Sequence, residues 1–86
     1  MIYEDLKNKK VLVTGSSSGI GRATAIMFSK QNCFVGVHYF KTKAGAQKTL
    51  EKVKKNSDGA LLCADMRDEK QVNEMVEQFA KAADGI

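Results

Sequence analysis

The sequence has few of the residues from which metal and redox centres are built. Its 86 residues include one histidine, His38, and two cysteines, Cys33 and Cys63. The cysteines do not form a C-x-x-C pair and no histidines cluster near them, so we expect neither a metal site nor a redox disulfide. We expect both thiols to be small buried hydrophobic groups and His38 to make a local hydrogen bond.

Long hydrophobic runs are also missing. No apolar segment reaches the length needed to cross a bilayer. Residues 1–5 carry acids where an export signal would carry lysine or arginine before an apolar stretch. These absences predict a cytoplasmic protein with reduced thiols and no membrane partner.

Positive charge is in excess but is unevenly distributed. The formal net charge is +4, and residues 41–55 contain six lysines against one acid. A basic segment can bind nucleic acid, but this one lacks interleaved aromatic residues and any recognised nucleic-acid motif. We therefore predict a solvated helix face with no nucleic-acid partner, in which only Lys41 is a ligand candidate.

The most informative segment of the chain is a short apolar strand followed by a glycine-rich turn and a helix start. Residues 11–13 are continuously apolar, as in a parallel strand buried on both faces. Gly15 permits a sharp turn, Gly19 removes a Cβ that would hold a phosphate away from the backbone, and Gly21 permits close helix–strand packing. The helix that follows would present its free amides and positive dipole end to phosphate groups.

The rest of the chain alternates between strand and helix patterns. We predict further strands at residues 34–39 and 60–64, and a helix after each strand. In the first helix, Ile20, Ala23, Met27 and Phe28 recur at helical spacing and are expected to pack on the sheet. Right-handed crossovers turn this β-α-β-α-β-α order into a parallel sheet of strand order 3-2-1 with helices on both faces. The predicted fold class is therefore α/β, a Rossmann-type sheet that forms the N-terminal half of a doubly wound fold.

The glycine spacing departs from the common G-x-G-x-x-G dinucleotide fingerprint. Thr14-Gly15-x-x-x-Gly19-Ile20-Gly21 resembles the motif of the short-chain dehydrogenase/reductase family, and within it 3-oxoacyl-acyl-carrier-protein reductases and glucose 1-dehydrogenases. The resemblance implies an oxidoreductase that transfers a hydride between a nicotinamide cofactor and a carbonyl or alcohol substrate. It covers residues 1–86 as the N-terminal dinucleotide-binding part of a Rossmann domain, and implies truncation before the fourth strand.

The family's catalytic serine, tyrosine and lysine lie after that fourth strand. No tyrosine follows Tyr39 in this sequence, so we expect no catalytic residue within residues 1–86 and no activity from this segment alone. A non-catalytic nucleotide-binding module that needs another chain to complete its sheet is the alternative. In either case residues 11–13 would have an unpaired apolar edge, which favours association, and the resemblance implies a homo-oligomer.

The resemblance also assigns cofactor-binding positions. In nicotinamide folds an acid that closes the second strand favours NAD, whereas a neutral residue with a nearby base accepts the 2′-phosphate of NADP. Tyr39 is neutral and Lys41 follows it, which favours NADP over NAD, although NADP-preferring relatives often carry a base at Ser18. The implied cofactor-binding set is Gly15, Ser17, Ser18, Gly19, Ile20, Gly21, Tyr39, Lys41, Asp65 and Met66.

Two assignments in this set have simpler alternatives. The hydroxyls of Ser17 and Ser18 would donate to a phosphate, or they would only tie the turn together. Asp65 and the amide of Met66 would face the adenine ring, or the Asp65 carboxylate would only stabilise the start of the following helix.

Overall fold

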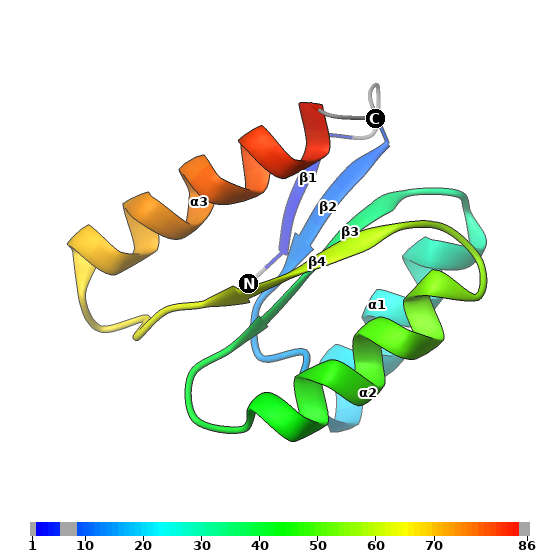
Figure 1. Ribbon diagram of the computed structural model, residues 1–86, viewed down its shortest axis with the longest axis horizontal. Coiled ribbons are helices and arrows are strands. Elements are labelled where there is room, and N and C mark those ends of the chain that lie inside the picture. Colours follow the sequence, from blue (N-terminus) through cyan, green and yellow to red (C-terminus); the bar gives the residue numbers. More distant parts are fainter. Residues whose placement is uncertain (1, 6–8, 85–86) are drawn as a thin grey trace.

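The computed structural model describes residues 2–5 and 9–84. Its strands form one mixed sheet, and its helices pack against that sheet (Figure 1). In chain order they are β1 (Ile2–Asp5), β2 (Lys10–Val13), α1 (Gly19–Lys30), β3 (Phe34–Tyr39), α2 (Lys43–Lys54), β4 (Gly59–Cys63) and α3 (Glu69–Asp84).

The sheet has the order β1-β2-β3-β4. Strands β2, β3 and β4 are parallel, with Val13 opposite Val37 and Val37 opposite Leu61. This confirms the predicted parallel arrangement of order 3-2-1. Helices α1 and α2 cover one face of the sheet and α3 covers the other, as Figure 1 shows.

The edge of β2 is paired, and the expectation of an unpaired apolar edge at residues 11–13 is wrong. Strand β1 runs antiparallel to β2, with Ile2 opposite Val13 and Glu4 opposite Val11. Strand β1 thus takes up ladder positions along β2 that would otherwise be open to another chain. The β2 edge is therefore not open to pairing with a strand of another chain, and it gives no reason to expect oligomerisation.

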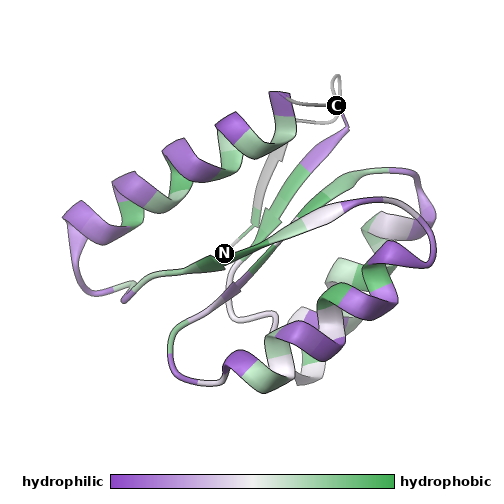
Figure 2. Cartoon of the chain, in the orientation of Figure 1, coloured by the Kyte–Doolittle hydropathy of each residue, from purple (hydrophilic) through white to green (hydrophobic). Residues whose placement is uncertain are grey.

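Strand alternation divides the hydrophobic core into two clusters. Towards α1 and α2 the buried residues are Val11, Val13, Ala25, Cys33, Val35, Val37, Ala46 and Val53. Towards α3 they are Leu12, Phe34, Leu62, Ala64, Met75, Phe79 and Ala83. Figure 2 shows the resulting pattern, with hydrophobic strands between helices whose outer faces are hydrophilic. Both faces of β2 and β3 are thus buried, as their unbroken apolar sequence predicts, whereas the edge strand β4 is mostly half-buried.

The buried face of α1 differs in part from the predicted one. Phe28 packs against the core as predicted, but Ala23 is exposed. Ile20 is 87% exposed and Met27 is 50% exposed, whereas Ala25 and Ser29 are buried. The cause lies at Gly21, where a Cβ would approach the carbonyl oxygen of Gly15 to within 2.2 Å. Because α1 approaches the glycine turn at this residue, the side chains four and eight positions later face the sheet, and Ile20 and Met27 turn outward.

The two cysteines also differ from each other. Cys33 is buried, as predicted, but Cys63 is exposed because it ends the edge strand β4. Within residues 2–5 and 9–84, no three histidine, cysteine or acidic side chains come together as a metal site. No helix in this part of the chain has the length and apolar character that a membrane span requires.

Candidate functional site

The glycine turn joins the carboxyl end of β2 to the first residue of α1. Gly15 has φ 66° and Gly19 has φ 59°, both in the left-handed region that glycine adopts most easily. The sharp turn predicted at Gly15 is confirmed, and so is close packing at Gly21, where the neighbour is the carbonyl group of Gly15. A Cβ on Gly19 would meet nothing within 4 Å, so the space in front of this residue is open.

The first turn of α1 faces this open space with polar groups available. Ser18 is the N-cap residue, and its side chain makes no cap hydrogen bond. The first helical hydrogen bond runs from the amide of Arg22 to the carbonyl oxygen of Ser18 over 3.2 Å, so the helix amides before Arg22 have no acceptor within α1. Among the described residues, nothing accepts or donates a hydrogen bond at the Ser17 or Ser18 hydroxyl.

Ser16 ties the turn together instead, a role that the sequence pattern did not indicate. Its buried Oγ donates to the carbonyl oxygen of Val13 over 2.7 Å and accepts from the amide of His38 over 2.9 Å. The amide of Ser16 in turn donates to the carbonyl oxygen of His38 over 3.1 Å. A serine beside a glycine turn is a weak signal for such a role, because its hydroxyl can bond many local backbone groups.

His38 links the glycine turn to the far strand of the parallel sheet. Its Nδ1 accepts from the amide of Gly15 over 2.8 Å, and its Nε2 lies 2.9 Å from the carbonyl oxygen of Ala64. The residue is 4% exposed. The prediction of a merely local hydrogen bond for this histidine is wrong, because both ring nitrogens bond backbone groups that are 23 and 26 residues away in the sequence.

A second link joins the turn to α2 through Arg22. Its Nη2 donates to the carbonyl oxygens of Ser17, over 2.6 Å, and Gly45, over 3.0 Å. Its Nε donates to the hydroxyl of Thr49 over 2.9 Å, and that hydroxyl donates to the carbonyl oxygen of Ser16 over 2.7 Å. Sequence reasoning missed this cluster. The only signal was the position of Thr49 between Ala46 and Val53 on the buried face of α2.

The predicted adenosine-side residues lie at the same edge of the sheet as the turn. Tyr39 ends β3 and is half-buried, while Lys41 is exposed with its Nζ 5.6 Å from the centroid of the Phe40 ring. The amide of Ala64 donates to the carbonyl oxygen of Tyr39 over 3.2 Å. Asp65 directly follows Ala64. Because β2, β3 and β4 are parallel, the glycine turn and the carboxyl ends of β3 and β4 lie along one edge of the sheet, which is called the rim below.

Asp65 is held by Arg67 rather than by the start of α3. Its carboxylate accepts from the backbone amide, Nε and Nη2 of Arg67 at 3.0, 3.1 and 3.1 Å. These hydrogen bonds lower the pKa of the Asp65 carboxyl below its ordinary value and raise the pKa of Arg67. The amide of Lys70 donates to the Asp68 carboxylate over 3.0 Å, so Asp68 caps α3 and the capping alternative for Asp65 is wrong. Met66, beside it, is exposed.

Tyr39 and Lys43 have the four-residue spacing of a Tyr-x-x-x-Lys pair. Tyr39 ends β3, whereas Lys43 is the first residue of α2. The spacing therefore spans a strand-to-helix connection and not one turn of a helix, where residues four apart lie side by side. This pair is therefore not the family's catalytic tyrosine–lysine pair, which the resemblance places after a parallel strand that would follow α3.

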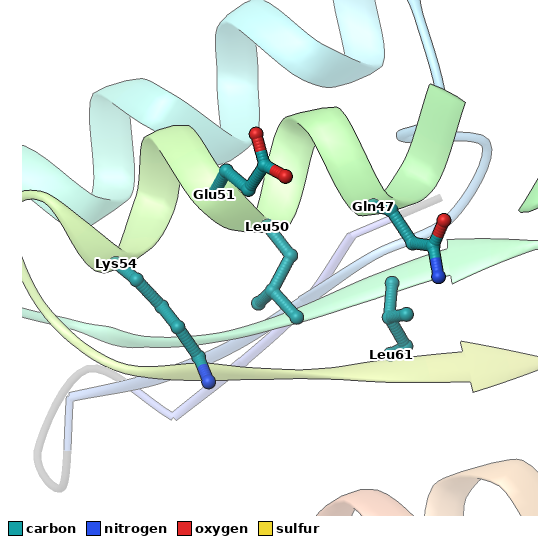
Figure 3. A pocket seen from close by; sticks show the side chains of 5 residues that line it. All are labelled: Gln47, Leu50, Glu51, Lys54 and Leu61. Atoms are coloured by element: carbon teal, nitrogen blue, oxygen red, sulfur yellow. The ribbon is translucent and has the colours of Figure 1, made fainter. Parts of the chain in front are cut away.

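A shallow pocket lies apart from this rim, between α2 and β4 (Figure 3). It is lined by Gln47, Leu50, Glu51, Lys54 and Leu61. None of the predicted site residues lines it, and it has no part in the site described above.

Comparison with known proteins identifies the family. A family model described as short chain dehydrogenase matches residues 9–86, and the chain belongs to this family. Glucose 1-dehydrogenase 2 of Bacillus subtilis (strain 168) is 45% identical over 60 residues, which cover 70% of this chain and 23% of that protein.

Solved structures agree with this membership. A DEH reductase A1-R′ mutant is 38% identical with a TM-score of 0.80, covering 91% of this chain and 32% of that chain. The angucycline C-6 ketoreductase LanV with bound NADP is 33% identical with a TM-score of 0.72, covering 80% of this chain and 27% of that chain. The chain thus spans about a quarter to a third of the length of these relatives.

Proposed function

We propose that this chain binds NADP along the rim formed by the glycine turn and the carboxyl ends of β3 and β4. It would be the cofactor-binding part of an oxidoreductase acting on a carbonyl or alcohol substrate. The observation that carries the proposal is the open space in front of Gly19, where a Cβ would meet nothing within 4 Å and the first turn of α1 begins. Backbone amides and a positive helix end facing such a space are suited to a pyrophosphate.

The polar groups of the turn fit this ligand. The hydroxyls of Ser17 and Ser18 have no partner among the described residues, and each can donate one hydrogen bond to a phosphate oxygen. Ser16 is occupied in holding the turn, so phosphate binding leaves the internal bonds of the turn intact. Ile20, exposed on the first turn of α1, would border the same ligand.

Lys41 supports NADP over NAD. It is exposed two residues after Tyr39, and residues 37–42 contain no acid that would repel a 2′-phosphate. The relative LanV has NADP bound. NAD is the competing cofactor, and it would bind the same turn without using the Lys41 charge.

Asp65 and Met66 are proposed to face the adenine. Although Arg67 holds the Asp65 carboxylate, two carboxylate oxygens offer about four acceptor positions. An adenine amino group can therefore donate to Asp65 while the Arg67 hydrogen bonds persist. These hydrogen bonds would orient the carboxylate for this role.

When bound, the nicotinamide cofactor supplies the hydride acceptor or donor. The residues of this chain bind and orient it: the turn fixes the phosphates, Lys41 the 2′-phosphate and Asp65 the adenine. Proton transfer at the substrate would fall to groups outside residues 1–86.

The test is a fluorescence titration with NADPH and NADH. We expect Gly19→Val to abolish binding of both, because the side chain fills the open space and the left-handed backbone strains a β-branched residue. Ala82→Val, which places the same side chain at an exposed position of α3, is the control. Binding retained in Gly19→Val with the fold intact would make the turn only structural.

A measurement of turnover distinguishes the cofactor-binding part of an oxidoreductase from a non-catalytic nucleotide-binding module. The isolated chain is expected to oxidise no NADPH with ketone substrates. The longer protein that contains it should do so if the chain is part of an enzyme.

A further inference from the structure

We propose that His38 is a positioning residue for this site, and that it works only as a neutral imidazole with its proton on Nε2. In that form it fastens the start of the glycine turn to the carboxyl end of β4. The inference rests on the proposed nucleotide-binding function and concerns how the same site is held in shape.

The hydrogen-bond partners determine the tautomer. The amide of Gly15 can only donate, so Nδ1 must be unprotonated to accept at 2.8 Å. The carbonyl oxygen of Ala64 can only accept, so Nε2 must carry the proton to donate at 2.9 Å. Both ring nitrogens are thus used by the backbone. No other protonation state of the ring satisfies both partners.

Protonation of Nδ1 would place two hydrogen-bond donors, the new N–H of the ring and the amide of Gly15, opposite each other. His38 is 4% exposed, so a new N–H on Nδ1 would be buried opposite another donor. The hydrogen bond to Ala64 survives in the imidazolium, whereas the one from Gly15 does not. Because Gly15 opens the turn with φ 66°, we expect acidification to release the start of the turn and to weaken dinucleotide binding.

Other ionisable groups near the His38 ring could also change the pH dependence of binding. The turn, residues 14–18, has no strongly ionisable side chain. On α3, which covers the same face of the sheet, Glu69, Lys70 and Glu74 are exposed. The ionisable side chains on the segments next to the ring are Tyr39, Lys41, Cys63, Asp65, Arg67 and Asp68. Of these, Asp65 and Arg67 are paired with each other.

The backbone of His38 holds the turn independently of the ring. Its amide donates to Ser16 Oγ and its carbonyl oxygen accepts from the amide of Ser16. These backbone hydrogen bonds persist with any side chain at position 38. Variants of His38 therefore keep these two backbone hydrogen bonds to Ser16 and are expected to fold.

The first experiment detects the tautomer without any cofactor. Long-range ¹H–¹⁵N NMR spectra of the chain at pH 8 should show the proton of His38 on Nε2. The amide signal of Gly15 should shift on acidification with the same midpoint as the imidazole. A proton on Nδ1 at pH 8, or a Gly15 amide that does not follow the imidazole, would overturn the inference.

The second experiment measures NADP⁺ affinity by calorimetry at pH 8 and pH 5.5. In His38→Asn the Oδ1 atom takes the place of Nδ1 as acceptor and does not titrate, whereas His38→Leu has no acceptor. At pH 8 we expect Leu, which loses both hydrogen bonds of the ring, to bind about tenfold more weakly than the native residue. Asn keeps the hydrogen bond from Gly15 and loses the one to Ala64, so its affinity should lie between the two. The Asn variant retains every other titrating group, including the 2′-phosphate of the cofactor. Any extra weakening of the native protein at pH 5.5 therefore belongs to the imidazole.

The outcomes distinguish the two proposals. Native binding at pH 8 combined with identical pH profiles for the native and Asn proteins would refute the role of His38 alone. Absence of NADP⁺ binding to the native protein at pH 8 would refute the proposed function, and the positioning role with it. The NMR result would still establish or exclude the structural link.

Discussion

The carbonyl oxygen of Ser17 lies between the guanidinium of Arg22 and the backbone of Gly45. Arg22 Nη2 donates to it over 2.6 Å, and a Cβ on Gly45 would approach it to 2.5 Å. Helix α2 therefore packs directly against the glycine turn with no side chain between them. The position of the turn and the position of the first turn of α2 are coupled by this contact.

Gly45→Ala should damage the proposed site although residue 45 lies outside the turn. The added methyl group would press on a backbone oxygen, so α2 or the turn must move. We expect unfolding to become easier by roughly 1–3 kcal/mol, the usual cost of overpacking, and NADPH to bind more weakly. Chemical denaturation and fluorescence titration measure the two effects. Ala44→Ser, at the exposed neighbouring position, is the control; equal behaviour of both variants would contradict the coupling.

Arg22→Lys tests whether the guanidinium geometry matters. A lysine retains the charge but has no planar fork, and it cannot hold Ser17, Gly45 and Thr49 together in the same way. We expect weaker binding of NADPH and NADH alike, because the turn serves both cofactors. Lys30→Arg, an exposed change near the end of α1, should have no effect on either titration. A weakening confined to one cofactor would show that Arg22 contacts the ligand itself.

Lys41→Ala tests the choice of cofactor. A charge-assisted hydrogen bond to a 2′-phosphate is worth about 1.5–3 kcal/mol, so NADPH should bind about tenfold or more weakly. NADH affinity should stay nearly unchanged. Lys48→Ala removes an equal charge from the exposed face of α2 and is the matched control. If NADPH and NADH lose affinity equally, Lys41 belongs only to the solvated lysine face.

The hydrogen bonds between Asp65 and Arg67 should make a small contribution to stability that depends on pH. Because the pKa of Asp65 is lowered in the folded state, the unfolded chain binds the proton more readily. The contribution is therefore complete above the ordinary pKa of 3.8 and is lost as the pH falls below it. Thermal unfolding of Asp65→Asn against the native chain should show a lower Tm at pH 7 and a smaller difference near pH 2. A difference independent of pH would argue against this origin.

Features that depend on a few neighbouring residues were predictable from the sequence. The apolar run at 11–13 and the glycines at 15 and 21 defined the strand, the turn and the close approach of α1. The right-handed crossover rule then supplied the strand order. These features need no knowledge of distant contacts.

Features that depend on distant partners were not predictable. The ring of His38 bonds Gly15 and Ala64, which lie 23 and 26 residues away. Arg22 reaches Thr49 across 27 residues. Side-chain bonds to backbone groups leave no periodic pattern. The buried face of α1 was missed for a related reason, because packing at Gly21 outweighed the hydrophobicity of Ile20.

Strand β1 closes one edge of the sheet with four residues that pair with β2. It ends the strand order, so it has a neighbouring strand on one side only, and its Ile2 side chain is 44% exposed. Backbone hydrogen bonds contribute little net free energy when water can replace them. Local opening should therefore begin here, and amide hydrogen exchange should be faster in β1 than in β3. The pairing that covers the β2 edge is therefore expected to be the part of the sheet that opens first.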